Sequence, residues 1–262
     1  MYLSEQVLSI RDCEFTKGCD MENLDLNGKT AIITGAGRGI GRAVALALAS
    51  RGARVIVCAR TEEQVTETTE LINVSGGTAW SYVFDLAKEE HILSLFAFLD
   101  EKSDRIDILV NNAGIGRFGL LHEFSTQDLR DLVDVNVSGT FICCREALKR
   151  MIPRKSGYII NISSVVGFKG YPNQAAYTAT KHAVVGMTKS LAVEAQEHKI
   201  RASVINPGGV YTDLIKSARP DLDPAILMQP EDIAQAVLYL LSLSERCAVD
   251  EIYIRRRGSK PF

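Results

Sequence analysis

A glycine-rich segment near the start of the chain constrains the fold most strongly. Residues 30–34 form a short apolar run, and four of the next seven residues are glycines, namely Gly35, Gly37, Gly39 and Gly41. Residues 39–50 then carry apolar side chains at helical spacing among several alanines. A strand, a glycine turn and a helix in this order let the backbone approach a phosphate group at the helix N-terminus. We therefore predict that these glycines bind a nucleotide.

Short apolar runs alternate with helix-like segments through the rest of the 262-residue chain. Besides residues 30–34, we predict strands over residues 54–59, 80–84, 106–110, 158–162, 202–205 and 251–254. We predict helices over residues 39–50, 62–72, 88–102, 126–151, 173–198 and 230–243. Apolar strands that alternate with helices are typical of a parallel sheet covered on both faces. The pattern therefore predicts one doubly wound α/β domain with a seven-stranded sheet over residues 28–262.

The composition argues against several classes of protein. A formal net charge of −2 gives no electrostatic reason to expect nucleic acid or an anionic membrane as partner. The apolar runs are too short to span a bilayer. The six cysteines form no CxxC pair, so we expect reduced thiols and a cytoplasmic location. The four histidines do not cluster with other ligand types, so we expect no metal site.

The first part of the chain differs from the rest. Residues 1–27 are polar and weakly periodic, and they lack the basic start and apolar core of a signal peptide. We expect this segment to be an N-terminal extension, mobile or peripheral to the domain.

A tyrosine and a lysine lie one helical turn apart in the predicted helix 173–198. Tyr177 and Lys181 are separated by four residues and therefore face the same side. A free tyrosine has a pKa of about 10, and a nearby ammonium group is expected to lower the pKa of Tyr177 into a useful range. Ser163 and Ser164 offer hydroxyls for a substrate oxygen. Such a pair alone is usually a solvated face, but the glycine-rich segment favours a catalytic interpretation.

These motifs, in this order, resemble those of the classical short-chain dehydrogenase/reductase family. The resemblance runs from about Gly28 to Ser242. Its motifs are Thr34–Gly41, Asp85, Asn111–Gly114, Asn136, Ser164, Tyr177, Lys181 and Pro207-Gly208. The resemblance implies a Rossmann fold with strand order 3-2-1-4-5-6-7 and a homodimer or homotetramer. In this family the helices at 126–151 and 173–198 pair across subunits, and we expect apolar contacts there from Phe141, Ile142, Val184 and Leu191.

The resemblance also implies a role for each catalytic residue. Tyr177 would be the general acid in ketone reduction and the base in the reverse direction. Lys181 would hold the ribose hydroxyls of the cofactor and lower the pKa of the tyrosine. Ser164 would hydrogen-bond the reacting oxygen, with Ser163 as the second choice. Asn136 would bend its helix and hold a proton-relay water, the alternative being a buried asparagine satisfied by the backbone.

Further positions match the cofactor contacts of the family. Nicotinamide carries the hydride, and the protein supplies orientation and a proton. Beyond the glycines and the catalytic pair, the cofactor-binding positions that the resemblance implies are Arg38, Ile40, Arg60, Asp85, Leu86, Asn112, Ala113, Gly114, Val210 and Thr212.

The end of the second predicted strand indicates which nicotinamide cofactor is used. An enzyme that selects NAD usually carries Asp or Glu there, which accepts from the ribose 2′-hydroxyl. Ala59 stands at this place and cannot accept. Arg60 and Arg38 are suited to a 2′-phosphate, although each could also be a surface charge. We therefore expect NADP(H).

The substrate end is less defined by the sequence. Residues 213–229 match a short mobile lid in the family, and the pocket-wall candidates are Gly116, Phe118, Val165, Phe168, Tyr171 and Gln174. After the last predicted strand the chain carries Arg255–Arg257, where many relatives that reduce acyl-carrier-bound ketones are glycine-rich. We read this run as a solvated tail, with an anionic substrate or a neighbouring subunit as other possible contacts.

We predict an NADPH-dependent carbonyl reductase, or the reverse alcohol oxidation, acting on a small ketone or secondary alcohol. Two alternatives stay open at this point. One is a 3-oxoacyl-[acyl-carrier-protein] reductase of fatty-acid synthesis. The other is a non-catalytic protein of the same fold that senses NADP or acts as a scaffold.

Overall fold

The computed structural model of the chain describes residues 21, 23–219 and 221–261. The strands are β1 (Thr30–Thr34), β2 (Arg54–Ala59), β3 (Thr78–Val83), β4 (Ile108–Asn111), β5 (Gly157–Ile162), β6 (Ile200–Pro207) and β7 (Glu251–Ile254). The helices are α1 (Gly39–Ala49), α2 (Glu62–Val74), α3 (Glu89–Lys102), α4 (Thr126–Val133), α5 (Thr140–Met151), α6 (Ala175–Gln196), α7 (Asp213–Ala218) and α8 (Pro230–Ser242). Each predicted strand and helix is present with ends shifted by a few residues, except that the one helix predicted over residues 126–151 is divided into α4 and α5.

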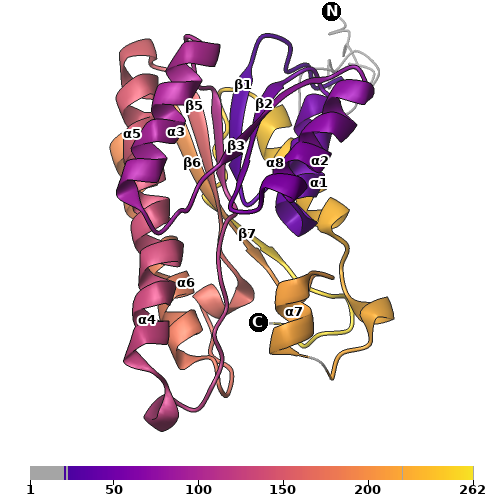
Figure 1. Cartoon of the computed structure of the whole chain (residues 1–262), viewed down its shortest axis with the longest axis vertical. Helices are drawn as coiled ribbons and strands as arrows, with labels where there is room; N and C mark the ends of the chain where they lie inside the picture. Colours follow the sequence, from indigo (N-terminus) through magenta and orange to yellow (C-terminus); the bar gives the residue numbers. More distant parts are fainter. Residues whose placement is uncertain (1–20, 22, 220, 262) are drawn as a thin grey trace, which may run out of the picture.

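The strands form one seven-stranded sheet in the order β3-β2-β1-β4-β5-β6-β7, and every pairing between neighbours is parallel (Figure 1). This confirms the predicted α/β class and the strand order that the resemblance implied. The order in which successive strands are added to the sheet reverses between β1 and β4, since β2 and β3 lie on one side of β1 and β4 to β7 lie on the other. Ligands of open parallel sheets bind at the carboxyl ends of the strands beside such a reversal.

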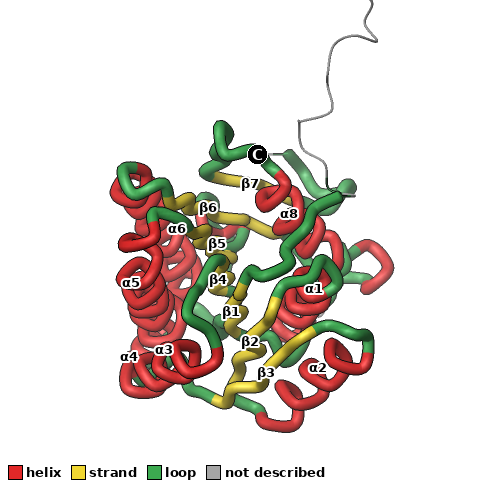
Figure 2. Tube along the Cα trace, turned by 90° about the horizontal axis from the view of Figure 1, so that it is seen from above, coloured by secondary structure: helices red, strands yellow, loops and turns green. Residues whose placement is uncertain are grey.

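Helices cover both faces of the sheet (Figure 2). Neighbouring residues of a strand point to opposite faces, so each buried strand supplies two cores. Ile33 joins the core beneath α1 and α8, while the adjacent Ile32 joins the core beneath α3 and α5. Both side chains are fully buried. The continuous apolar strands of the sequence follow from this double burial.

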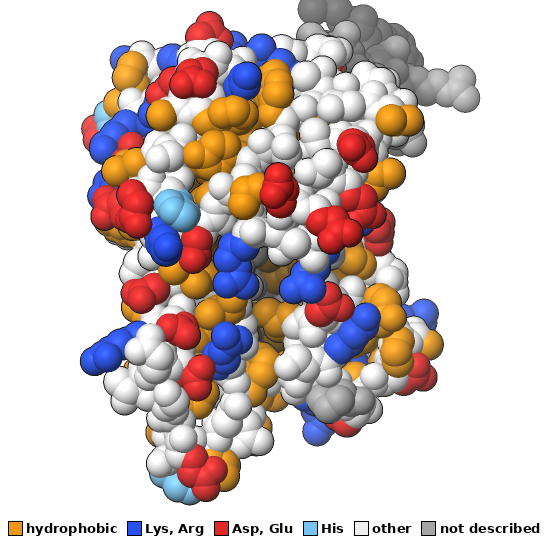
Figure 3. Space-filling view, viewed as in Figure 1, with side chains coloured by type: hydrophobic (Ala, Val, Ile, Leu, Met, Phe, Trp, Pro, Cys, Tyr) orange, Lys and Arg blue, Asp and Glu red, His pale blue; other side chains and the backbone are white. Residues whose placement is uncertain are grey.

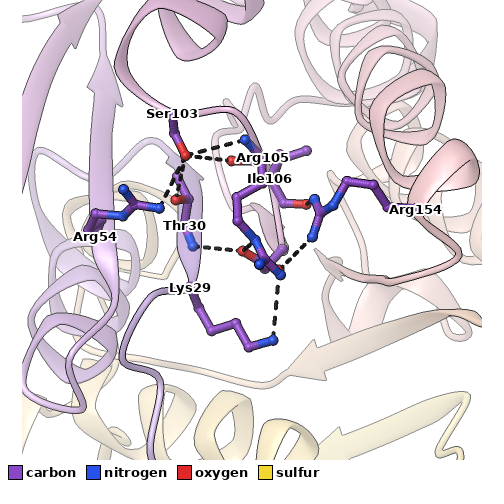
Figure 4. Close-up of polar contacts among 8 residues, drawn as sticks. Lys29, Thr30, Arg54, Ser103, Arg105, Ile106 and Arg154 are labelled. Atoms are coloured by element: carbon purple, nitrogen blue, oxygen red, sulfur yellow. Dashed lines mark hydrogen bonds and ion pairs between the residues drawn. The ribbon is translucent and has the colours of Figure 1, made fainter.

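A charged cluster closes the amino-terminal edge of the sheet, the edge opposite the glycine-rich segment (Figure 4). The carboxylate of Asp107, only 5% exposed, accepts from the Thr30 backbone N–H at 2.9 Å, from Arg105 Nε at 2.8 Å and from Arg154 at 3.0 Å. Arg154 also donates to the Ile106 carbonyl at 2.9 Å. Asp107 therefore ties β1, β4 and the segment after α5 together.

Most of the predicted N-terminal extension lies outside the described residues, which begin at residue 21 and resume at 23. Leu26, at the end of that extension, is 5% exposed, and its N–H donates to the Arg51 carbonyl at 2.8 Å. The packed domain therefore begins a few residues before residue 28. Within the described part of the chain, none of the helices combines the length and apolar character that crossing a bilayer requires.

Two of the four residues expected at a subunit interface lie elsewhere. Val184 is 2% exposed and Leu191 is 6% exposed, because both point from α6 into the protein's own core. That part of the expectation is wrong. Phe141 of α5 is 54% exposed, and Ile142 is partly buried.

Candidate active site

A cleft of about 540 Å³ opens along the carboxyl edge of the sheet. It is lined by predicted site residues that follow the ends of six strands, β1 to β6, and by two from α6, namely Gly35, Gly37, Arg38, Gly39, Ile40, Arg60, Asp85, Leu86, Asn112, Ala113, Gly114, Ser164, Val210 and Thr212 with Tyr177 and Lys181. Two predicted residues, Gly41 and Asn136, lie behind the lining. Figure 3 shows lysine and arginine side chains gathered around the hollow on this side of the molecule.

The glycine-rich segment is shaped by close backbone contacts. Gly35 has φ of +66°, and a Cβ there would lie 2.8 Å from Ala113 Cα. A Cβ at Gly41 would lie 2.3 Å from the Gly35 carbonyl oxygen, so α1 can begin this close to the turn only with glycine at that position. Asn112 Nδ2 donates to the carbonyls of Thr34 at 3.0 Å and Gly35 at 3.1 Å. Gly41 and Asn112 therefore hold the shape of the turn.

The two hydroxyls predicted to be catalytic come from the end of β5 and the first turn of α6. Tyr177 is 7% exposed, lies edge-on to Phe118 with ring centroids 5.5 Å apart, and lines the cleft together with Ser164. Ser163 Oγ instead donates to the Lys181 carbonyl at 2.9 Å. The Ser163 hydroxyl therefore fixes α6, which favours Ser164 as the residue that faces the substrate.

Burial sets the protonation of the Tyr177–Lys181 pair. Burial raises the pKa of Tyr177 well above its ordinary value, and the nearby Ser164 hydroxyl only partly offsets the rise. The expectation that Lys181 lowers this pKa is wrong for this structure. Its Nζ lies 5.8 Å from the centroid of the Tyr177 ring and donates to the Ile162 carbonyl at 3.1 Å. Burial also lowers the pKa of Lys181 to about 8.

Asn136 lies in a widened π-helical turn, Asp134–Gly139, that joins α4 to α5. The single helix expected over residues 126–151 is therefore interrupted at this residue. Asn136 Oδ1 accepts from the Ile115 N–H at 2.9 Å, and Nδ2 donates to the Ile115 carbonyl at 3.0 Å and to Thr180 Oγ1 at 3.1 Å. A Cβ at Gly114 would lie 3.1 Å from Asn136 Oδ1 and 3.5 Å from Lys181 Nζ, so both residues border the same glycine. A proton-relay role stays a prediction.

Two arginines line the end of the cleft near β2. Ala59 ends β2 without a carboxylate, and the exposed Arg60 follows it. Arg38 forms an ion pair with Asp213, the first residue of α7. Gln64 also lines this end, and a Cβ at Gly37 would lie 2.8 Å from the Gln64 Cβ. Asp213 was not anticipated as a partner of Arg38.

The structure adds lining residues that sequence reasoning did not name, and removes two. Among the additions are Thr61 and Gln64. Both lie within a few residues of the end of β2, which is the one signal that could have found them. Asp213 and Arg219 of the predicted lid and Arg256 of the arginine run also line the cleft. Of the expected pocket-wall residues, Gly116 and Phe168 do not line the cleft. The Phe168 ring instead packs edge-on against Tyr253, with centroids 4.2 Å apart.

Comparison with known proteins agrees with this site. The family model for short chain dehydrogenases matches residues 29–223. A 3-oxoacyl-[acyl-carrier-protein] reductase of Synechocystis sp. is 38% identical over 221 residues, 82% of this chain and 90% of its own length. A 3beta-hydroxysteroid dehydrogenase of Mediterraneibacter gnavus is 38% identical over 195 residues, 74% of this chain and 70% of its own. The crystal structure of a metagenomic short-chain oxidoreductase in complex with NADP superposes with a TM-score of 0.79 at 34% identity, covering 89% of this chain and 99% of that one.

The fold and the cleft define an oxidoreductase with a Rossmann-type nucleotide site. The chain belongs to the short-chain dehydrogenase/reductase family. The family resemblance of the sequence motifs is thereby confirmed. The two relatives at 38% identity carry the names of enzymes with quite different substrates. Sequence identity to these relatives therefore does not identify the substrate of this chain, which has to be argued from the residues of its own cleft.

Proposed function

We propose that this protein is an NADPH-dependent carbonyl reductase that converts a ketone to a secondary alcohol, and that it catalyses the reverse oxidation when the cofactor ratio favours it. One observation carries the proposal: the hydroxyl side chains of Ser164 and Tyr177 line the same cleft, near enough that Ser164 acts to lower the pKa of the tyrosine, and Lys181 lies beside the tyrosine ring. Two adjacent hydroxyls suit a carbonyl oxygen that gains negative charge.

The chain's own residues supply the proton. When bound, the nicotinamide cofactor supplies the hydride. Tyr177 is protonated at neutral pH, as an ordinary tyrosine with a pKa of about 10 already is, and burial raises its pKa further, so its O–H is present for donation to the developing alkoxide. Ser164 hydrogen-bonds the same oxygen and orients it. Burial lowers the pKa of Lys181 to about 8, so this side chain is still mostly charged at pH 7 and would hold the ribose hydroxyls of the cofactor.

The residues present fit NADP(H). The glycines leave a cradle that side chains would fill, since a Cβ at Gly37 would lie 2.8 Å from Gln64. At the end of β2, Ala59 leaves no carboxylate to repel a 2′-phosphate, and Arg60 and Arg38 supply donors. A solved relative in complex with NADP, at 34% identity, supports the same choice.

A second candidate function is 3-oxoacyl-[acyl-carrier-protein] reduction. The 38% identity to the Synechocystis enzyme, which covers 90% of that protein, favours it. The chain's ending, Glu251–Arg257, differs from the glycine-rich ending of many such reductases and favours small ketones. The two candidate functions differ in the size of the substrate and in whether the substrate has to be a thioester.

The test is a ketone panel assayed with NADPH, in which small ketones are compared with a 3-oxoacyl thioester. We expect turnover of small ketones, and Tyr177→Phe should remove most of it, because a placed proton donor contributes roughly 10²–10⁴-fold. Tyr239→Phe, a change on α8 away from the cleft, is the matched control. A Tyr177→Phe variant that keeps more than about half of kcat would contradict the role. Turnover of the thioester alone would favour the second candidate.

We also propose that the protein is a cytoplasmic homo-oligomer, a dimer or tetramer. The support is three large apolar side chains left exposed on the helices that pair across subunits in the family: Phe141 is 54% exposed, Leu129 41% and Val193 74%. Exposed apolar side chains on these helices are available for contact with a second subunit. Light scattering at micromolar concentration tests this, and a strictly monomeric mass would refute it.

A further inference from the structure

The last strand brings the C-terminal arginines to the cleft. β7 lies parallel to β6, with Pro207 opposite Ile254, and the Gly208 N–H donates to the Ile254 carbonyl at 2.7 Å. The chain after β7 therefore emerges at the carboxyl edge of the sheet, where the site is. The expectation of a tail in solvent is wrong for one of the three arginines, because Arg256 lines the cleft.

The three arginines have different surroundings. Arg255 donates to the carbonyls of Arg256, Arg257 and Ser259, so it fixes the fold of the tail. Arg257 is exposed and does not line the cleft. Arg256 is partly buried, and a Cβ at Gly209 would lie 3.4 Å from both its Cδ and its Nε. The stem of Arg256 therefore packs against the loop that follows β6.

Arg256 lies on the substrate side of the cleft. The same loop touches the segment after the catalytic serine, since a Cβ at Gly208 would lie 3.4 Å from Arg255 Cα and 3.6 Å from Val165 Cγ1. Val165 directly follows Ser164 in the chain. Leu222 of the lid segment also lines the cleft. Arg256 is thus on the opposite side of the site from Arg60, which follows β2.

The two cations of the lid segment, residues 213–229, that line the cleft already have carboxylate partners. Arg219 donates twice to Asp221, at 2.7 Å and 2.6 Å, and Lys216 pairs with Asp213 at 3.4 Å. The guanidinium of Arg256 makes no hydrogen bond or ion pair with any residue that the structure describes. Arg256 acts on Asp221 only through its charge. The pKa of Asp221 is lowered mainly by the hydrogen bond from Arg219 and least by the charge of Arg256.

We propose that Arg256 binds an oxyanion of the substrate, and that the substrates are small ketones bearing a carboxylate or a phosphate ester. A guanidinium forms paired, charge-assisted hydrogen bonds with either group. Cations outnumber carboxylates along the whole lining, although the chain as a whole has a net charge of −2, so the cleft attracts anions. This inference depends on the proposed carbonyl reductase function and names its substrate class.

The test compares acids with matched neutral compounds. The wild type is assayed with NADPH on 2-oxobutanoate, 3-oxobutanoate and 4-oxopentanoate against their methyl esters, and on dihydroxyacetone phosphate against dihydroxyacetone. We expect kcat/KM for at least one acid to exceed that of its neutral partner by about tenfold or more. Arg256→Met should lower this acid-to-neutral ratio by about tenfold or more, mainly through KM. Arg256→Lys should keep part of the ratio.

Arg257→Met is the matched control, since it makes the same change in charge one residue away, and its ratio should equal that of the wild type. Thermal melting shows whether each variant is folded. An equal ratio in wild type and Arg256→Met, or a wild type that prefers the neutral partners, would overturn the inference and leave the reductase function standing. If no ketone is turned over, the reductase function fails. Calorimetric titration of the wild type and Arg256→Met with the same acids then tests whether Arg256 binds an oxyanion, and the absence of binding to the wild type would overturn the inference.

Discussion

Arg38, in the glycine-rich turn, donates to the carboxylate of Asp213, the first residue of α7. The pair joins the cofactor end of the cleft to the segment that covers the substrate end. The two side chains are 63% and 53% exposed, so the pair adds little to stability. Asp213 nevertheless occupies the guanidinium that the 2′-phosphate of NADPH is proposed to use.

We therefore expect Asp213→Asn to strengthen NADPH binding, because Arg38 would no longer be shared with a carboxylate. An exposed ion pair contributes at most about 1 kcal/mol, so the Kd of NADPH should fall by up to about fivefold. Fluorescence titration measures both cofactors, and the Kd of NADH should change less, since NADH lacks the 2′-phosphate. A weaker affinity for NADPH in Asp213→Asn would show that the pair positions Arg38 for the phosphate.

The double change Ala59→Asp with Arg60→Ile should reverse the cofactor preference. A carboxylate at residue 59 repels a 2′-phosphate and accepts from a 2′-hydroxyl. Hydrogen bonds to charged groups contribute roughly 1.5–3 kcal/mol, so the wild type should prefer NADPH by about tenfold or more. The measurement is kcat/KM with each cofactor for both proteins. Equal efficiencies in the wild type would show that Arg60 and Arg38 are surface charges.

Lys181→Met should abolish turnover while altering stability in a pH-dependent way. Burial lowers the pKa of folded Lys181 to about 8, against about 10.4 in an unfolded chain. Between these values the unfolded state binds more protons, so the wild type gains stability as the pH rises through this window. Urea unfolding from pH 7 to 10 should show the wild type improving relative to the variant, by up to about 1.4 kcal/mol per pH unit. Lys88→Met, an exposed position, should show no such trend.

Asp107→Asn should destabilise the fold without touching the cleft. Burial alone would raise the pKa of Asp107, but hydrogen bonds from Arg105, Thr30 and Arg154 outweigh burial and lower it. Removing the charge leaves partly buried cations unpaired, and we expect a loss of about 2–4 kcal/mol in the free energy of unfolding at pH 7.

The pH dependence follows from the lowered pKa of Asp107. Its contribution is complete above the ordinary value of about 3.9 and is lost as the pH falls through the lower, folded value. The difference between wild type and Asp107→Asn should therefore shrink in acid. Asp104→Asn, an exposed neighbour, is the control and should cost much less. A pH-independent difference would mean that the carboxylate charge is not what stabilises this edge.

The sequence alone determined the architecture, because its signals are local. Buried strands on a parallel sheet must be apolar on both faces, and Ile32 and Ile33 show this directly in the printed chain. The glycines near residue 35 mark a turn that other residues could not adopt. The order of the strands and the catalytic roles came from resemblance of motifs, which the strand pairing and the cleft lining then placed in one site.

Only the tertiary structure decided what depends on burial and on contacts between distant segments. The direction of the pKa shift of Tyr177 follows from how deeply the folded protein buries the phenol, which the spacing to Lys181 cannot show. The pairing of Arg38 with Asp213 joins residues far apart in the chain. The position of Arg256 follows from β7 lying alongside β6, since that pairing carries the tail to the carboxyl edge. Periodicity reports which face of an element is buried, but the neighbours across the cleft are set by the packing of the whole domain.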